Sequence, residues 1–239
     1  MRLLVSVVDA DEARVAAAAG ADIVDVKNPA EGSLGAPAPG VIADVRAAVP
    51  AQLAVSAAIG DMPNLPGTAA LAALGAARSG ATFVKVGLWG VSTEAEAVAL
   101  LRAVKDGAAG SVVVAGAYAD ARRVAGAPLA PKLLPRVARA AGVGVCLLDT
   151  AVKDGRGLLD WLSLDALTSL VAEAHRAGLQ VALAGALRAE DLPLLGATEA
   201  DIVGVRSAAC DGARRSGPLD PDRVRALQAA CAATPRASR

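Results

Sequence analysis

Lysine is rare in this chain, and three of its lysines occur where a strand is expected to end. The sequence of 239 residues contains five lysines among 24 basic side chains, so arginine is its usual cation. Lys27 and Lys85 close short β-branched runs, and Lys153 lies in the loop after another run. An amine can lose its proton and attack a carbonyl, whereas a guanidinium stays charged. Lysine at these positions therefore indicates amine chemistry.

Asp25 and Lys27 are spaced to act together at the end of one strand, 23–27. Residues two apart in a strand point to the same face, and in a parallel barrel the strand's carboxyl end forms the mouth of the active site. Burial lowers the pKa of a lysine amine, which would make Lys27 a nucleophile while Asp25 handles protons. A structural ion pair that caps the barrel is an equally weighted alternative.

Two further strand ends carry the same residue types. Lys85 either faces the interior beside Lys27, where two ammonium groups lower each other's pKa, or forms a structural pair with an acid such as Asp25. The interior position is the favoured prediction. Asp149 ends the sixth expected strand and is predicted to point inward as a carboxylate. Lys153, in the following loop, is predicted to reach a phosphate or to serve as an acid.

Glycine-bearing loops follow the seventh and eighth expected strands, where barrels commonly bind phosphate through backbone N–H groups. The candidates are Gly185 and Ala186 in the first loop, and Gly204, Arg206 and Ser207 in the second. Arg206 is predicted to add a fork of guanidinium donors. Together with an amine-rich mouth, these loops indicate a phosphorylated carbonyl compound as the substrate.

Three other side chains carry weaker signals. His175 lies in an expected helix away from any strand end, so a half-buried surface position is favoured over catalysis. Tyr118 follows the fifth expected strand, where donation of a hydrogen bond to substrate and plain packing are equally good interpretations. Trp89 is interpreted as a residue that covers the site or fills the shell around it.

The composition excludes several classes of function. The net charge is zero and only 2% of residues are aromatic, which argues against a nucleic-acid partner. Three isolated cysteines and one histidine predict no metal site, and no nucleotide-binding glycine motif occurs, so no cofactor is expected. No apolar run is long enough for a membrane span, and no signal-peptide pattern is found. We therefore expect no membrane partner and a place in the reducing cytoplasm.

Eight strand–helix alternations with no break in composition predict an α/β fold, a (β/α)8 TIM barrel. One domain is expected over residues 1–239, with 235–239 as a frayed tail. The expected strands are 3–8, 23–27, 53–57, 82–86, 111–115, 143–149, 180–184 and 201–205. The first expected helix begins after residue 9 or 11 and ends at residue 19. The other expected helices are 39–49, 68–79, 93–104, 131–141, 164–177, 189–195 and 221–232. The alanine-rich outer helices are compatible with a homo-oligomer, although no interface can be located from them.

These motifs resemble those of the (5-formylfuran-3-yl)methyl phosphate synthase family of methanofuran biosynthesis. The similar segments are 23–35, 56–61, 84–88, 149–155, 182–185 and 201–206, which extend over nearly the whole chain. The resemblance implies condensation of two triose phosphates, starting from glyceraldehyde 3-phosphate, with loss of phosphate and water and without a metal or organic cofactor. It also implies Lys27 as the Schiff-base lysine and Lys85 as the acid/base that interconverts the triose phosphates. Asp25, Asp149 and Lys153 would assist proton transfer.

The route expected from this resemblance forms an enamine of dihydroxyacetone phosphate on Lys27, which adds to the aldehyde of a second triose phosphate. Two alternatives remain open. A class I aldolase or an enzyme like triose-phosphate isomerase would use the same amine but would make no ultraviolet-absorbing furan. A non-catalytic barrel that binds phosphometabolites would tolerate Lys27→Ala without loss of function.

Overall fold

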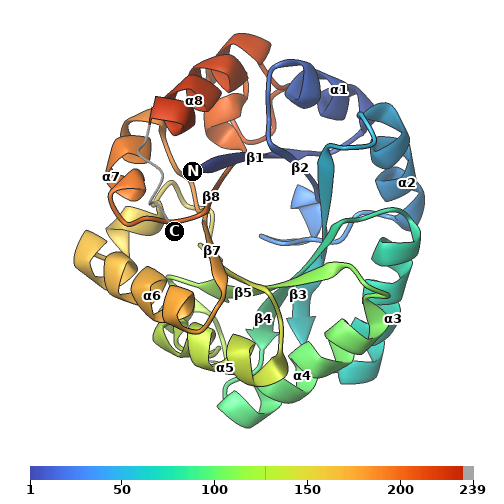
Figure 1. Cartoon of the computed structure of the whole chain (residues 1–239), viewed down its shortest axis with the longest axis vertical. Coiled ribbons are helices and arrows are strands. Elements are labelled where there is room, and N and C mark those ends of the chain that lie inside the picture. Colours follow the sequence, from blue (N-terminus) through green and yellow to red (C-terminus); the bar gives the residue numbers. More distant parts are fainter. Residues whose placement is uncertain (127, 234–239) are drawn as a thin grey trace.

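Eight parallel strands close into a barrel in the order of the sequence, and β8 pairs with β1 to complete the ring (Figure 1). The computed structural model describes residues 1–126 and 128–233. The strands are β1 (Arg2–Val7), β2 (Ile23–Val26), β3 (Ala54–Pro63), β4 (Phe83–Gly90), β5 (Val112–Tyr118), β6 (Val145–Asp149), β7 (Gln180–Leu183) and β8 (Ile202–Val205). The TIM-barrel prediction is therefore confirmed.

A ring of helices covers the outside of the barrel, and α8 lies beside α1 (Figure 1). The helices are α1 (Ala10–Ala18), α2 (Pro39–Ala48), α3 (Pro66–Arg78), α4 (Glu94–Gly107), α5 (Leu134–Ala141), α6 (Leu164–Arg176), α7 (Leu192–Gly196) and α8 (Pro221–Ala233). Local signals begin several of them. Asp9 accepts a hydrogen bond from the backbone N–H of Glu12 at the start of α1, and Thr93 and Glu96 form a capping box at the start of α4.

Small residues allow the outer helices to pack closely. A Cβ atom added to Gly107 of α4 would lie 2.2 Å from the carbonyl oxygen of Ala70 in α3, so the two backbones are in direct contact there. The alanines of the chain are thus used where helices approach each other and the strands beneath them, for example Ala69, Ala73 and Ala76 on the buried face of α3.

An apolar floor lies inside the barrel beneath the polar residues of the mouth. Ile23 precedes Asp25 by two residues on the same face of β2, and both are buried. Six strand residues form this floor: Ile23, Val114, Val145, Leu147, Ala182 and Ile202. At the next level toward the mouth, Ser6, Asp25 and Ser56 are in-register partners on β1, β2 and β3. The barrel interior is therefore apolar at the bottom and polar at the top.

Three strands, β3, β4 and β5, extend further toward the mouth than the sequence predicted. β3 continues through Pro63, with register shifts after Ala58 and after Asp61, whereas a loop was expected from residue 60. Irregular pairing explains why no alternating pattern marks this stretch. Asp61 consequently lies in a strand at the mouth. A smaller difference is that Lys105, expected in a turn after α4, lies in the last turn of that helix.

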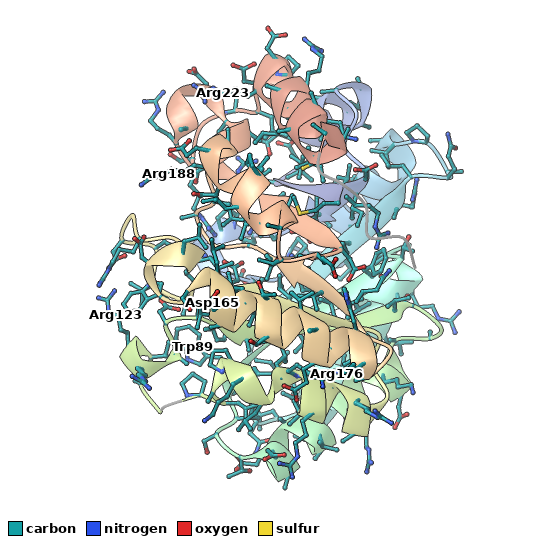
Figure 2. The ribbon with its side chains drawn as sticks, turned by 60° about the vertical axis from the view of Figure 1, so that its left-hand side comes forward. Trp89, Arg123, Asp165, Arg176, Arg188 and Arg223 are labelled. Carbon is teal, nitrogen blue, oxygen red and sulfur yellow. The ribbon has the colours of Figure 1, made fainter. Side chains whose placement is uncertain are left out.

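Figure 2 identifies the end of the barrel at which the strands finish. In Figure 2, α6 extends from near Asp165 at one end to Arg176 at the other, and Trp89 and Arg123 lie at the end of Asp165. Trp89 is near the end of β4 and Arg123 follows β5, so this is the end where the strands finish.

The expected tail at 235–239 lies outside the described residues. Within 1–126 and 128–233, no helix is long and apolar enough to cross a membrane.

Candidate active site

A cavity at the carboxyl end of the strands brings the predicted catalytic side chains together. Lys27, Lys85, Lys153, Asp25 and Asp149 all line it. The other polar or loop residues at its wall are Ser6, Ser56, Gly155, Gly185, Ala186, Gly204, Arg206, Ser207 and Arg215. The apolar floor closes the bottom, so the cavity is a cup with charged walls and an apolar base.

Lys85 and Asp25 form a buried ion pair inside the barrel. The Nζ atom of Lys85 lies 2.7 Å from each carboxylate oxygen of Asp25, and both side chains are buried. The hydroxyl of Ser6 donates to the same carboxylate at 3.0 Å. Both interpretations of Lys85 therefore hold, because it faces the interior and also pairs with Asp25. This pair places an exchangeable proton at the cavity wall.

Lys27 is a buried amine beside that pair. The residue is 6% exposed, and its backbone N–H donates to the carbonyl of Val7 at 3.1 Å. Burial, together with the charges of Lys85 and Arg215, lowers the pKa of Lys27 to about 7, although the carboxylates of Asp149 and Asp25 oppose the shift. A substantial fraction of this amine is consequently uncharged, and nucleophilic, near neutral pH.

Lys153 folds back onto Asp149 on the opposite wall. Its Nζ atom donates to Asp149 Oδ1 at 2.8 Å, to the carbonyl oxygen of Thr150 at 2.6 Å and to the Thr150 hydroxyl at 3.1 Å. Burial alone would raise the pKa of Asp149, but the nearby charges of Lys153 and Lys27 and two hydrogen bonds lower it to about 2. Asp149 is therefore ionised, and the Lys153 ammonium is directed at it.

The loops after β7 and β8 border the cavity. The backbone N–H groups of Gly185, Ala186 and Ser207 have no acceptor among the described residues. Ala186 has a φ of 47°, a left-handed conformation that costs energy in a residue with a Cβ atom. Gly204, predicted in the loop after the eighth strand, lies within β8 and lines the same wall from there. Free N–H groups in a strained turn are a common arrangement for an anion.

Arg206 lines the cavity, but the N–H donors of its guanidinium group are already hydrogen-bonded to other residues of the protein. It donates to both carboxylate oxygens of Glu12. It also donates to the carbonyl oxygens of Ser6 at 3.1 Å, Arg215 at 3.0 Å and Gly217 at 3.1 Å. These bonds use all of the guanidinium N–H groups. In place of the predicted phosphate fork, the structure shows a buried contact that joins the loop after β8 to α1.

Asp61 is a residue of the mouth that sequence reasoning missed. Its carboxylate accepts hydrogen bonds from the backbone N–H of Ser33 at 2.7 Å, from that of Leu34 at 3.2 Å and from the Tyr118 hydroxyl. Asp61 thus fastens the loop that follows Lys27 to β3. The sequence carries no signal for this contact because the stretch reads as a loop.

Asp120 is a second missed residue and fastens the loop that contains Lys153. Its two carboxylate oxygens accept from the backbone N–H groups of Ala151 at 2.7 Å and Val152 at 2.8 Å. The signal that could have identified it is an acid two residues after the end of β5. The Ser33 hydroxyl donates to the Thr150 carbonyl at 2.8 Å, so the loops after β2 and β6 are also joined to each other.

The weaker candidates lie outside the cavity wall. Tyr118 is buried and bonds to Asp61, so of its two interpretations the structure favours an internal role over contact with substrate. Trp89 packs edge-on against Tyr118, with ring centroids 5.5 Å apart. His175 is half-buried on α6, with Nε2 2.9 Å from an oxygen of Asp201. Over 1–126 and 128–233, no group of three or more His, Cys, Asp or Glu side chains is arranged to hold a metal ion.

Comparison with known proteins places this chain in a family. The family model described as 4-HFC-P synthase matches residues 3–228, which include every side chain of the site named above. The chain belongs to the 4-HFC-P synthase family. Two relatives named (5-formylfuran-3-yl)methyl phosphate synthase, from Methanococcus maripaludis strain C7 and Methanocaldococcus jannaschii, are each 50% identical to it over 236 residues. The alignments cover 97% of this chain and 99% and 100% of those relatives.

Other members of the TIM-barrel class share the fold of this 4-HFC-P synthase family chain at low sequence identity. The crystal structure of 3-hexulose-6-phosphate synthase from Salmonella typhimurium matches with a TM-score of 0.66 and 18% identity. The match covers 97% of this chain and 99% of that one. At this identity the similarity concerns the fold alone.

Proposed function

We propose that this chain condenses two molecules of glyceraldehyde 3-phosphate to (5-formylfuran-3-yl)methyl phosphate through a Schiff base on Lys27. The observation that carries the proposal is the buried amine of Lys27, with a pKa of about 7, between two lysine–carboxylate pairs. The family membership and the names of the relatives support the same product. Small triose phosphates are thus the proposed partners, and the net reaction releases one phosphate and two water molecules.

The branched carbon skeleton of this product determines which carbons join. Its ring carbon that bears the phosphate arm comes from the keto carbon of dihydroxyacetone phosphate, and the formyl group comes from the aldehyde of the other triose. Addition of a dihydroxyacetone phosphate enamine to an aldehyde, as first expected, would give an unbranched six-carbon chain. The aldehyde of glyceraldehyde 3-phosphate is therefore the carbonyl that reacts with Lys27 in our proposal.

The first half of the route prepares the two halves of the ring. Lys85, with Asp25 as its proton partner at 2.7 Å, moves a proton between the first two carbons of one triose and yields dihydroxyacetone phosphate. The neutral Lys27 amine adds to the aldehyde of the other triose and loses water, which leaves an iminium ion. Removal of the neighbouring proton then expels phosphate from the third carbon and leaves an enol conjugated to the iminium.

The second half joins and closes the skeleton. The terminal carbon of the enol adds to the keto carbon of dihydroxyacetone phosphate, and the free hydroxyl of that triose closes a five-membered hemiketal. Two dehydrations make the ring aromatic, and hydrolysis frees the aldehyde from Lys27. Asp149 and Lys153, 2.8 Å apart, are the proposed proton carriers of these steps. No net redox change occurs, so the route requires no redox cofactor.

The test combines product analysis with trapping. We expect glyceraldehyde 3-phosphate alone to give a furan absorbance and one phosphate per furan, and borohydride to leave a mass adduct on the peptide that contains Lys27. Lys27→Met should abolish both, while Lys132→Met, at an exposed position in the short 3-10 helix before α5, should keep them. Full turnover without an adduct on Lys27 would overturn the mechanism. Isomerised or unbranched sugar phosphates without furan would favour the aldolase or isomerase alternative.

A further inference from the structure

Arg215 is a cavity-lining cation that the proposed steps do not use. It lies in the loop after β8, its guanidinium group is partly buried at the cavity wall, and its Nη2 atom donates to the carbonyl oxygen of Gly32 at 3.3 Å. Gly32 belongs to the loop that follows Lys27. Arg215 therefore extends across the mouth from the last strand to the second.

The charge of Arg215 is not balanced by an ion pair. Among residues 1–126 and 128–233, no carboxylate lies within salt-bridge distance of it. Burial lowers its pKa and the neighbouring charge of Arg206 acts in the same direction, while the carboxylates of Asp149 and Asp61, beyond salt-bridge distance, oppose the shift. A guanidinium that faces a cavity without a counter-ion is favoured by an anion that can accept a bidentate pair of hydrogen bonds.

The loop that carries Arg215 is held from beneath. Arg206 donates to the carbonyl oxygens of Arg215 at 3.0 Å and Gly217 at 3.1 Å, and Arg206 is itself fixed by Glu12. At the base of the loop, Cys210 and Leu219 form an antiparallel bridge. The backbone at Arg215 is thus positioned before any ligand binds, which reduces the entropy cost of binding.

We propose that Arg215 binds the phosphate group of the triose whose carbonyl reacts with Lys27. This inference rests on the proposed function and assigns a specificity-determining residue to it. The weak hydrogen bond from Arg215 to Gly32 is exchanged for a bidentate contact with the phosphate, and Gly185, Ala186 and Ser207, whose N–H groups have no acceptor among the described residues, line the same cavity. Arg206 acts as a positioning residue, since its donors hold the loop.

The experiment measures phosphate preference at the Schiff-base step. Borohydride adducts on the Lys27 peptide are quantified with glyceraldehyde 3-phosphate and with glyceraldehyde as competing carbonyls. We expect the unsubstituted protein to prefer the phosphorylated aldehyde, and Arg215→Ala to lose about 10- to 100-fold of that preference, the range expected when charge-assisted hydrogen bonds are removed. Loss of the Arg215 charge should also raise the pKa of Lys27 and slow its reaction with both aldehydes, so the ratio of the two adducts is the quantity measured. Arg215→Lys should recover part of the preference.

Arg214→Ala is the matched control. Arg214 is the neighbouring residue, is exposed and lies 3.8 Å from Asp211 in a surface ion pair, so its loss should leave the preference intact. Retention of the full phosphate preference in both Arg215→Ala and Arg215→Gln would overturn the inference. Absence of any Lys27 adduct in the unsubstituted protein would instead overturn the proposed function, so the two failures are distinguishable.

Discussion

At the scale of single residues, the buried amine of Lys27 links reactivity to stability. Its pKa falls from 10.5 to about 7, so between these values the unfolded chain binds a proton that the folded chain does not. Stability should therefore rise with pH across this window, and the penalty for the buried charge is complete below about pH 7. The same side chain that becomes nucleophilic near neutral pH thus destabilises the fold at lower pH.

Lys27→Met should stabilise the protein most where the native lysine is charged. We expect a gain on the order of a few kcal/mol below about pH 7, decreasing toward zero near pH 10.5. Thermal unfolding of the variant and the unsubstituted protein across this pH range measures the difference. Lys132→Met, at an exposed position, should show no comparable pH dependence. A constant difference at every pH would contradict the low pKa.

Asp25→Asn should have the opposite effect because it leaves the Lys85 ammonium buried without a counter-ion. Both side chains of the pair are at most 6% exposed. Loss of one partner of such a pair costs about 3–5 kcal/mol in the free energy of unfolding. Asp154→Asn is the matched control, since its pairs with Arg123 and Arg156 are at the surface and should contribute about 1 kcal/mol or less. Denaturant unfolding of both variants provides the comparison, and equal losses would disprove the expected role of burial.

Part of this site could be predicted residue by residue. The alternation of β2 placed Asp25 and Lys27 on one face, and the lysines at strand ends identified Lys85 and Lys153, because these signals are local in the chain. The partner of Arg206 could not be predicted, since Glu12 lies 194 residues away and closed-barrel geometry alone brings them together. Arg215 was missed for a related reason, as its position over the cavity depends on that contact.

At the scale of elements, the loops after β2, β5 and β6 behave as one connected rim. Asp61 holds the first, Asp120 holds the third, and Ser33 bonds to Thr150 between them. Local sequence predicted the strands and helices but not this rim, because backbone N–H groups that bind a distant carboxylate leave no pattern of residue types. The residues that hold this rim together do not line the cavity, so they position Lys27 and Lys153 from behind its wall.

Asp61→Ala should loosen the loop that follows Lys27. Two backbone N–H groups, of Ser33 and Leu34, and the Tyr118 hydroxyl lose their acceptor. We expect faster amide hydrogen exchange at Ser33 and Leu34 and a loss of roughly 10-fold or more in Schiff-base formation at Lys27. Tyr118→Phe keeps both backbone bonds and should cost only about 1 kcal/mol of stability. Unchanged exchange in Asp61→Ala would show that the loop is held by other contacts.

At the scale of the whole molecule, the first and last β/α units are joined by more than the pairing of β1 with β8. Glu12 of α1 accepts from Arg206 after β8 and also from the backbone N–H of Val8 at 3.0 Å. The two side chains of this pair are 6% and 13% exposed. This side-chain contact therefore supplements the pairing of β1 with β8 where the barrel closes.

Glu12→Gln should weaken this closure. The buried Arg206 loses its counter-charge, and we expect the free energy of unfolding to fall by about 3–5 kcal/mol. Asp11→Asn, on the same helix, removes an exposed ion pair with Arg14 and should change stability by less than about 0.5 kcal/mol. Denaturant titrations monitored by circular dichroism separate the two cases. Equal stability of both variants would contradict a structural role for the Glu12–Arg206 pair.

The two tryptophans of the chain provide an optical reporter of the mouth. The guanidinium groups of Arg156 and Arg123 lie over Trp161, 4.5 and 5.6 Å from its ring centroid, and Trp89 contacts Tyr118, which is bonded to Asp61. Intrinsic fluorescence should therefore respond to movement of the loops around the cavity without an added label. With so few indole chromophores, the near-ultraviolet background also stays low enough to follow a newly formed heteroaromatic compound directly.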